Sequence, residues 1–242
     1  MHLRLILYKG IYIALSGAVL KQKHLDIFSQ NIANATTPGY KKERISFKDY
    51  LIPVDNKPPL VTDGRVMTEA SRIITDFSSG IVMRTGNPLD LAINGDGFFA
   101  LEGGMYTRNG NFKIDNEGYL ATQDNKKLLG SGGPVAVQGR KIDVNAAGEI
   151  FVDDVSVGAL RIVDFDDKSK MKKVDGGAFL TDEPGKDMQA SVSQGYLEGS
   201  NVEVMKEIVQ MITSLREFES YQKMIQTFDE AASKVSNEMG KG

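Results

Sequence analysis

The sequence contains no cysteine and only two histidines, His2 and His24. The lack of cysteine excludes disulfide bonds, thiol nucleophiles and cysteine zinc sites, and it leaves open whether the compartment is reducing or oxidising. His2 lies in the N-terminal leader and His24 lies inside a helical pattern, so the two do not suggest a metal or catalytic pair. We therefore expect no metal ion and no cofactor.

Long apolar runs are also missing. No stretch approaches the roughly 20 residues that span a bilayer, and Leu3–Leu7 is too short for a secretory signal and lacks its cleavage site. We therefore expect neither an integral membrane segment nor a cleaved leader. The net charge of -3 has mixed signs, and Lys41, Lys42 and Arg44 form only a small basic cluster, so a nucleic-acid partner is not expected.

Motifs for catalysis are absent from the sequence as well. Asp164–Lys170 resembles a calcium loop, but Ser169 and Asp175 stand where such a loop needs glycine and glutamate. The glycines at 95–97 and 130–133 precede no helical pattern, and no serine nucleophile elbow or kinase signature occurs. The sequence therefore predicts no enzyme, although a pair of glycosidase carboxylates would leave no spacing signal.

What the chain does contain is globular: 242 residues, 41% hydrophobic and 25% charged, enough for one or two domains. Apolar residues recur near the C-terminus at spacings of four and three, which is the pattern of a coiled-coil seam. A capping box at Ser200 and Glu203 predicts a helix over residues 201–237, roughly 55 Å long. The seam is Val204, Ile208, Met211, Leu215, Phe218, Gln222 and Ile225.

A matching pattern near the N-terminus predicts a second helix, which ends at Thr37-Pro38-Gly39. A glutamine in each seam either fixes the register of packing or lies exposed to solvent. The two helices either form an antiparallel hairpin within one monomer or bury their seams against other subunits. The N-terminal seam is Ile11, Leu15, Ala18, Gln22, Leu25, Phe28 and Ile32.

Between the helices, the sequence changes to short strands separated by glycine turns. Residues 53–64 resemble a linker, and Asn94-Gly95-Asp96-Gly97 and Asn109-Gly110 are hairpin signals. Turns roughly every ten residues predict an antiparallel β domain, barrel-like or meandering. The fold class is thus α+β. The expected parts are 1–45 (helix and turn), 46–75 (linker and extended segment), 76–196 (β domain) and 197–242 (helix).

Four segments carry a resemblance to a known family. They are residues 31–41 (Asn-Ile-Ala-Asn-Ala-Thr-Thr-Pro-Gly-Tyr-Lys), 89–99, 106–112 (Tyr-Thr-Arg-Asn-Gly-Asn-Phe) and 195–202. Together they resemble the rod branch of the rod and hook family of bacterial flagellar axial proteins, nearly from end to end. The motif residues that we carry over from the N-terminal signature are Asn31, Asn34, Gly39 and Tyr40.

The resemblance implies a structural subunit of the basal-body rod. Its terminal helices would form the inner α layer of a tube that transmits torque and encloses the export channel, with the β domain outside. It further implies other proximal and distal rod subunits as partners, contacts with a ring or bushing, and periplasmic localisation after type III export without a cleaved signal. Phe47 and Leu51 are similar to an export-gate motif, or else Phe47 anchors an amphipathic turn.

Several alternatives stay open. The chain's length and residues 128–135 are more similar to proximal-rod than to distal-rod members, and the distal rod is the alternative. Met1–Tyr8 extends beyond the family pattern, either because translation starts later or because the segment adds a contact. A different class of function is a self-associating β-domain binding module or cell-wall hydrolase.

Overall fold

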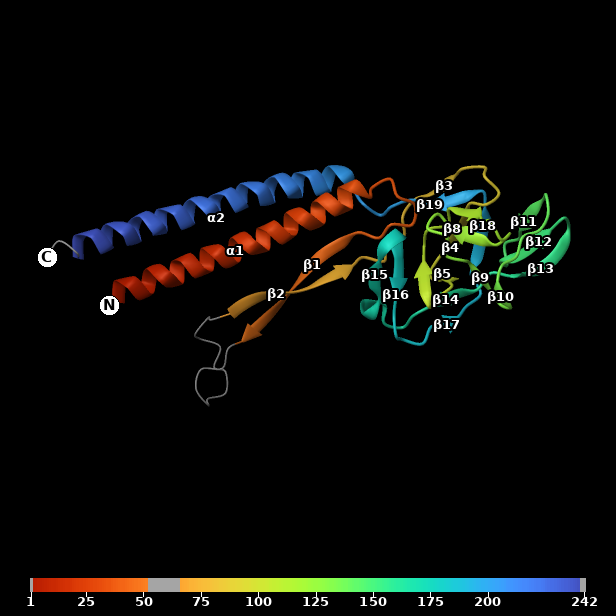
Figure 1. The fold of residues 1–242 in the computed structure, drawn as a ribbon, viewed down its shortest axis with the longest axis horizontal. Helices are drawn as coiled ribbons and strands as arrows, with labels where there is room; N and C mark the ends of the chain where they lie inside the picture. Colours follow the sequence, from red (N-terminus) through yellow and green to blue (C-terminus); the bar gives the residue numbers. More distant parts are fainter. Residues whose placement is uncertain (1, 52–65, 240–242) are drawn as a thin grey trace. The chain divides into compact units, whose positions relative to one another are not determined.

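The computed structural model describes the backbone of residues 2–51 and 66–239, and the side chains of residues 10–46, 72–174 and 176–234. A helix lies at each end of the chain, and the antiparallel strands come between the two helices in the sequence (Figure 1). This confirms the α+β class. The chain divides into two compact units. The helical unit comprises Met1–Ala33, Glu43–Ile74 and Glu203–Gly242, and the β unit comprises Asn34–Lys42 and Thr75–Val202. The domain boundaries expected at 45, 75 and 196 remain predictions.

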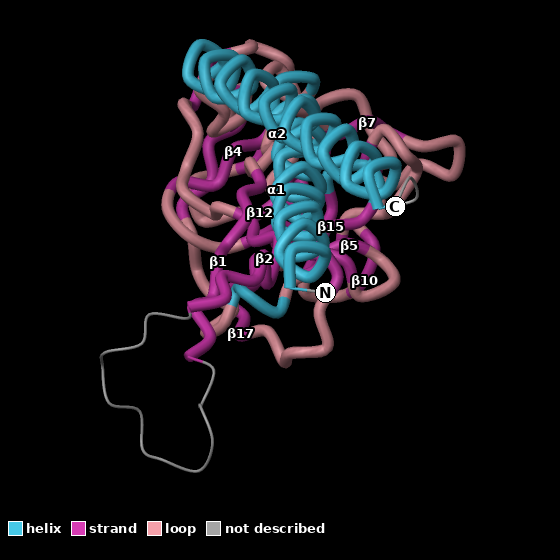
Figure 2. Tube along the Cα trace, turned by 90° about the vertical axis from the view of Figure 1, so that its left-hand side faces the viewer, coloured by secondary structure: helices cyan, strands magenta, loops and turns pink. Residues whose placement is uncertain are grey.

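Within the helical unit, α1 (His2–Ala33) and α2 (Val204–Met239) lie side by side and run in opposite directions (Figure 1). Figure 2 views this pair from the end that carries both termini. Lys21 Nζ lies 2.6 Å from Glu217 Oε2, and Gly17 faces the ring of Tyr221. The structure therefore has the antiparallel hairpin within one chain. None of the described helices is both long and apolar enough to cross a bilayer.

The helix boundaries differ from the predicted ones at all four ends, and the smallest difference is at the end of α2, which lies at Met239 rather than at residue 237. α1 already begins at His2, so residues 2–8 continue the helix, and it ends at Ala33 ahead of the Thr37-Pro38-Gly39 turn. α2 begins at Val204 rather than at residue 201. The predicted capping box is wrong, because Ser200 Oγ accepts from Val202 N–H at 3.3 Å while Asn201 N–H donates to Tyr40 O, which keeps residue 201 outside the helix.

The remaining part of the helical unit is a two-stranded sheet of β1 (Glu43–Leu51) and β2 (Val66–Thr75). Both strands lie largely within the stretch 46–75, where a linker and an extended segment were expected. Most of the predicted linker, residues 53–64, lies outside the described residues.

The β unit is built on a six-stranded antiparallel sheet with the strand order β15-β16-β6-β5-β14-β17. Its strands are β5 (Phe98–Leu101), β6 (Met105–Thr107), β14 (Ile162–Asp164), β15 (Lys172–Val174), β16 (Ala178–Leu180) and β17 (Lys186–Asp187). A three-stranded sheet follows the order β11-β12-β13. Its strands are β11 (Ile142–Val144), β12 (Glu149–Val152) and β13 (Val155–Ala159).

Four strand pairs complete the β unit, and two short 3-10 helices, Lys168–Lys170 and Asp175–Gly177, flank β15. The pairs are β3 (Val82–Arg84) with β19 (Tyr196–Glu198), β4 (Leu91–Asn94) with β18 (Ser191–Gln194), β7 (Phe112–Ile114) with β8 (Leu120–Thr122), and β9 (Leu129–Gly130) with β10 (Gly133–Pro134).

Strand β5 lies at the centre of the hydrophobic core. Successive side chains of a strand point to opposite faces of the sheet. Phe99 and Leu101 accordingly join the larger buried cluster, whereas Phe98 and Ala100 join a second cluster with Phe179. The sheet is therefore covered on both faces at β5, which explains why this strand is an unbroken apolar run in the sequence.

Two of the predicted hairpins are wrong. The turn Asn94–Gly97 joins β4 to β5, but β4 pairs with β18 and β5 pairs with β6 and β14. The turn at Asn109-Gly110 likewise joins strands of different sheets, β6 and β7. By contrast, Asp115–Gly118 closes the hairpin of β7 and β8. The Asn94–Gly97 turn serves another purpose, because its carbonyl groups accept hydrogen bonds from the side chain of Arg108.

Candidate functional site

A buried cluster of three charged residues lies in the β unit. The carboxylate of Glu198, in β19, accepts from Lys41 Nζ at 2.7 Å and from Arg108 Nε at 2.7 Å. All three residues are at most 5% exposed to solvent. Burying charges this deeply is costly unless each is paired and hydrogen-bonded. The stability of the cluster therefore depends on whether its remaining polar atoms have hydrogen-bond partners.

Arg108 satisfies its guanidinium with backbone carbonyl groups around the Asn94–Gly97 turn. Its Nη1 donates to Gly95 O at 2.9 Å and to Gly97 O at 2.7 Å, and its Nη2 donates to Ile93 O at 3.2 Å. The rigid fork of an arginine suits such simultaneous contacts. This side chain thus ties the β4–β5 turn to the carboxylate on β19.

Lys41 completes the cluster from the N-terminal side of the chain. Its ammonium also donates to Ser78 O at 2.7 Å, and Gly80 N–H donates to the same Glu198 oxygen at 2.9 Å. Burial lowers the pKa of Lys41, and the hydrogen bond that its ammonium donates to Glu198 offsets this only in part. Burial alone would raise the pKa of Glu198, but the charge of Arg108 and the bond to Lys41 outweigh it and lower that pKa. Glu198 is therefore held ionised.

The backbone around Gly39 brings Lys41 to this position. Gly39 N–H donates to Glu198 O at 2.7 Å, and the residue has a φ of +67°, which favours glycine. A Cβ at this position would lie 2.3 Å from Asn109 N. Glycine is therefore required here twice, by its conformation and by the close approach of the 108–109 backbone.

Asn201 fastens the same segment from the other side. Its Oδ1 accepts from Lys42 N–H at 2.8 Å, and its Nδ2 donates to Asp76 O at 2.8 Å. Tyr40 is buried, and Lys173 Nζ lies 3.5 Å from the centre of its ring. Residues 39–42 are thus held between the segments that contain Asp76 and Asn201. We call Lys41, Arg108, Glu198 and Asn201 the junction network.

In the helical unit, the side chain of Asn31 likewise holds separate segments together, and we call this arrangement the Asn31 clamp. Its Nδ2 donates to Glu43 O at 2.9 Å and to Glu207 Oε2 at 3.1 Å, and its Oδ1 accepts from Glu43 N–H at 3.0 Å. Asn31 is 1% exposed. A single amide therefore links the end of α1, the start of β1 and the first turn of α2.

The four motif residues expected from the sequence all lie at these structural joints. Asn31 forms the clamp, Asn34 accepts from Thr37 N–H and Oγ1 in the turn after α1, and Gly39 and Tyr40 adjoin the junction network. Their role in function remains a prediction. The sequence interpretation missed Lys41, Arg108 and Glu198 as partners. A signal was available, because each is the only charged residue in its motif segment: 31–41, 106–112 and 195–202.

The face of α1 that packs on α2 is displaced from the predicted seam. Gly10, Gly17, Lys21 and Asn31 contact α2, and Ala14 is fully buried. Among the predicted residues, Ala18 is buried and Ile11, Leu25, Phe28 and Ile32 are half-buried, whereas Leu15 and Gln22 are exposed. Gln22 Nε2 donates to Asp26 Oδ1 of its own helix at 3.2 Å.

The predicted seam of α2 is divided in the same way. Ile208, Met211, Phe218 and Ile225 are half-buried, whereas Val204, Leu215 and Gln222 are exposed. Glu207 and Ser214, at positions between the predicted ones, are buried instead. The exposed seam residues thus stay available for contacts outside the chain, and their role in assembly remains a prediction. Phe47 and Leu51 lie in β1, but their side chains lie outside those the structure describes.

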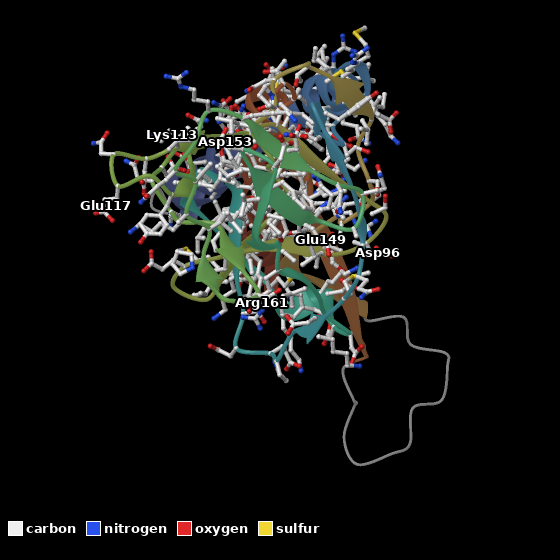
Figure 3. The ribbon with its side chains drawn as sticks, turned by 90° about the vertical axis from the view of Figure 1, so that its right-hand side faces the viewer. Asp96, Lys113, Glu117, Glu149, Asp153 and Arg161 are labelled. Atoms are coloured by element: carbon white, nitrogen blue, oxygen red, sulfur yellow. The ribbon has the colours of Figure 1, made fainter. Side chains whose placement is uncertain are left out.

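The β unit also has a groove of about 980 Å³, lined by small residues such as Gly130, Ala147 and Ala190 together with larger side chains. Figure 3 shows the side of this unit that carries two of its charged lining residues, Glu149 and Arg161. Arg161 Nε bonds to Asp187 Oδ1 at 2.8 Å, so the arginine is already paired. Across the described residues, no three carboxylate, histidine or cysteine side chains gather as a metal site would need.

Comparison with known proteins identifies three family models along the chain. Residues 11–41 match the model described as Flagella basal body rod protein, and residues 92–157 match the Flagellar hook protein FlgE/F/G D1 domain. Residues 193–238 match the Flagellar basal body rod FlgEFG protein C-terminal. These ranges include all four residues of the junction network.

Curated relatives align over nearly the whole chain. Flagellar basal-body rod protein FlgF of Caulobacter vibrioides is 32% identical over 96% of this chain and 98% of its own length. Flagellar basal-body rod protein FlgG of Bacillus subtilis is 30% identical over 95% of this chain and 98% of its own length. FlgF of Salmonella typhimurium is 30% identical over 91% of this chain and 94% of its own. The chain belongs to the family of flagellar basal-body rod proteins.

Proposed function

We propose that this chain is a structural subunit of the flagellar basal-body rod and joins other rod subunits through its terminal helices. The relatives are named as basal-body rod proteins, which supports the location and the structural role. The observation that carries the assembly step is a set of exposed apolar residues on both helices, at positions that the hairpin within the chain does not use.

These residues form two outer stripes. On α1 the stripe is Tyr12, Leu15 and Val19, exposed by 67%, 50% and 50%. On α2 it is Met205, Val209 and Ile212, exposed by 75%, 60% and 44%. Residues three and four apart lie on one face of a helix, so each stripe is continuous. Fully burying such a side chain contributes about 1.5–3 kcal/mol, so several together stabilise a contact with a neighbouring subunit.

In the assembly, the helices would form the inner α layer of a tube and pack in coiled-coil fashion against neighbouring subunits, and the barrel-like or meandering β unit would lie outside. The tube would transmit torque and enclose the export channel. The hairpin within the chain leaves Leu15, Val204 and Leu215 of the predicted seam exposed, which supports a role for these residues in contacts with neighbouring subunits. The role is mechanical, with no enzymatic step and no cofactor.

The partners that this proposal requires are proximal and distal rod subunits, the type III export apparatus and a surrounding ring or bushing, with the assembled rod in the periplasm. Phe47 and Leu51 would serve at the export gate. We propose the proximal rod in preference to the distal rod. The alignment with FlgF of Caulobacter vibrioides spans 246 positions against 259 for FlgG of Bacillus subtilis at a similar share of this chain, which means fewer gaps.

The test uses a chain tagged within residues 166–170 and follows its retention in detergent-extracted basal bodies. Ile212→Asp places a charge in the outer stripe of α2, and Thr213→Asp places the same charge on the neighbouring exposed position outside it. We expect retention of the parent chain and Thr213→Asp, and loss of Ile212→Asp and of a chain truncated after Ser200. Loss of the tagged parent chain as well would refute the rod assignment. Retention of Ile212→Asp would refute the role of the stripe.

A further inference from the structure

The sequence contains two Asn-Gly dipeptides, Asn94-Gly95 and Asn109-Gly110, and they lie in very different surroundings. In such a pair the glycine nitrogen can attack the side-chain amide carbon of the asparagine. Glycine has no Cβ, so the approach is less hindered than at any other residue. The reaction depends on whether the local backbone can move into position, and this the structure distinguishes.

Asn94 is at the exposed end of β4 and begins an open turn. Both Asn94 and Gly95 are exposed, and nothing lies within 4 Å of the place where a Cβ on Gly95 would stand. Asn94 Nδ2 lies 3.0 Å from Ser193 Oγ and 3.3 Å from Ser191 Oγ. Two hydroxyl groups therefore stand beside the nitrogen that would leave.

Asn109, by contrast, is fixed. Its Oδ1 accepts from Asn111 N–H at 3.0 Å, and its own N–H donates to Thr107 Oγ1 at 3.0 Å. Gly110 is buried, and a Cβ there would lie 1.6 Å from Leu91 O. Gly110 O also accepts from Leu91 N–H at 3.0 Å. Moving this glycine toward the side chain of Asn109 would break the contact with Leu91.

We propose that Asn94 is a site of spontaneous deamidation in the folded chain and that Asn109 is protected. The bond from Gly95 N to Asn94 Cγ forms, the Cγ–Nδ2 bond breaks, and ammonia leaves with the proton of the glycine amide. Water then opens the resulting succinimide to aspartate or isoaspartate. The reaction needs only solvent water, and nothing is oxidised or reduced.

The modification would reach the junction network through the same turn. Gly95 O and Gly97 O accept from Arg108 Nη1 at 2.9 and 2.7 Å. Isoaspartate at position 94 lengthens the backbone by one carbon immediately before Gly95. The added carbon moves the Gly95 carbonyl relative to Arg108, and this loosens a contact of a buried guanidinium. Deamidation of Asn94 would therefore weaken the contacts of Arg108 in the junction network as the protein ages.

The experiment incubates the full chain in mildly alkaline buffer, folded and in urea, and follows each asparagine by peptide mass spectrometry. In the folded chain we expect Asn94 to convert at least roughly tenfold faster than Asn109, because Asn109 must wait for local opening. In urea we expect similar rates at the two sites. Equal rates in the folded chain, faster conversion at Asn109, or conversion of Asn94 only in urea would each overturn the proposal.

Two variants separate the chemistry from the fold. Asn94→Gln keeps an amide but requires a larger ring to close, so the fast deamidation at this site should disappear while Asn109 stays unmodified. Aged parent protein should also exchange its amide hydrogens faster at residues 94–98 than Asn94→Gln protein aged in parallel. Equal exchange in the two aged samples would overturn the effect on the junction network.

Discussion

At the scale of single residues, Glu198 is the centre of the buried charge in the β unit. It receives hydrogen bonds from Lys41, Arg108 and Gly80 within a site closed to solvent. Removing one partner of a buried ion pair is far more costly than the pair's net contribution, because the other charge stays buried without compensation. The junction network is therefore rigid but intolerant of change.

Glu198→Gln should lower the free energy of unfolding by about 3–5 kcal/mol, since two cations would keep only a neutral amide as their partner. Chemical denaturation measures the loss. The matched control is Asp187→Asn, which removes a carboxylate from an exposed pair with Arg161 and should cost about 0–1 kcal/mol. Similar losses in the two variants would contradict the importance of burial.

His24 makes the helical unit sensitive to pH. Burial and then the charge of Lys21 lower its pKa from the ordinary value of 6.5, and Glu217 opposes them. The folded state therefore favours the neutral ring, and its contribution to stability is complete above about pH 6.5 and is lost as the pH falls toward the lowered pKa. We expect the stability of the parent chain to fall relative to His24→Gln between about pH 7 and about pH 5 in denaturant titrations. A constant difference would refute the coupling.

The sequence marks Lys41, Arg108 and Glu198 as the only charged residues of their motif segments, but it does not show that they contact one another. Lys41 and Glu198 are separated by 157 positions, and Arg108 lies 90 positions from Glu198. Local patterns carry no information about contacts at this distance. Gly39, Tyr40 and Asn31 were singled out through family resemblance, but their partners became apparent only in the fold. Asn201 was expected to start a helix and instead binds four residues of the β unit through its side chain and backbone.

At the scale of elements, the helix pair depends on small residues. Gly10 and Gly17 on α1 leave room for the rings of Phe228 and Tyr221 on α2, and Ala14 between them is fully buried. Apolar periodicity gives weight to large side chains, so it placed the predicted seam one position away from these glycines. The two helices could be predicted because each has a long apolar pattern. The face of α1 that packs on α2 could not, because it depends on the shape of the α2 side chains that it meets.

Gly17→Ala tests this packing. A Cβ at Gly17 would lie 2.6 Å from two ring carbons of Tyr221. Overpacking of this kind costs about 1–3 kcal/mol, which exceeds the gain of roughly 1 kcal/mol in helix propensity. We expect a net loss in thermal or chemical denaturation.

The second variant, Gly17→Ala with Tyr221→Leu, should recover part of this loss, because the smaller side chain makes room for the methyl group. Ser16→Ala, at the neighbouring exposed position, is the control for helix propensity. A stabilising effect of Gly17→Ala would show that the rings move aside at little cost.

At the scale of the whole molecule, the two units are interleaved along the chain. The backbone passes from one to the other near residues 33, 42, 74 and 202. Composition and turn spacing predicted an α+β chain with helical ends, and this is confirmed. They did not predict that residues 34–42 belong to the β unit. The sequence of this nine-residue segment does not indicate that it packs against a strand more than 150 positions away.

Hydrogen exchange can test whether the units respond separately. Glu198→Gln should speed exchange in residues 39–42 and 106–112 and leave residues 14–28 of α1 unchanged. Gly17→Ala should speed exchange in residues 14–28 and leave residues 39–42 and 106–112 unchanged. Each variant is the control for the other. Faster exchange in both units from either variant would show that they unfold as one.

The long separation of Lys41 from Glu198 also has a consequence in time. A chain made from its N-terminus delivers Lys41 early and its counter-ion only after 157 further residues. Closing so large a loop is slow, because the entropy must be lost before the contact forms. Until the last strand arrives, the segment around Gly39 has nowhere to dock. The segment around Gly39 is therefore among the first parts of the β unit to be made and among the last to reach its final position.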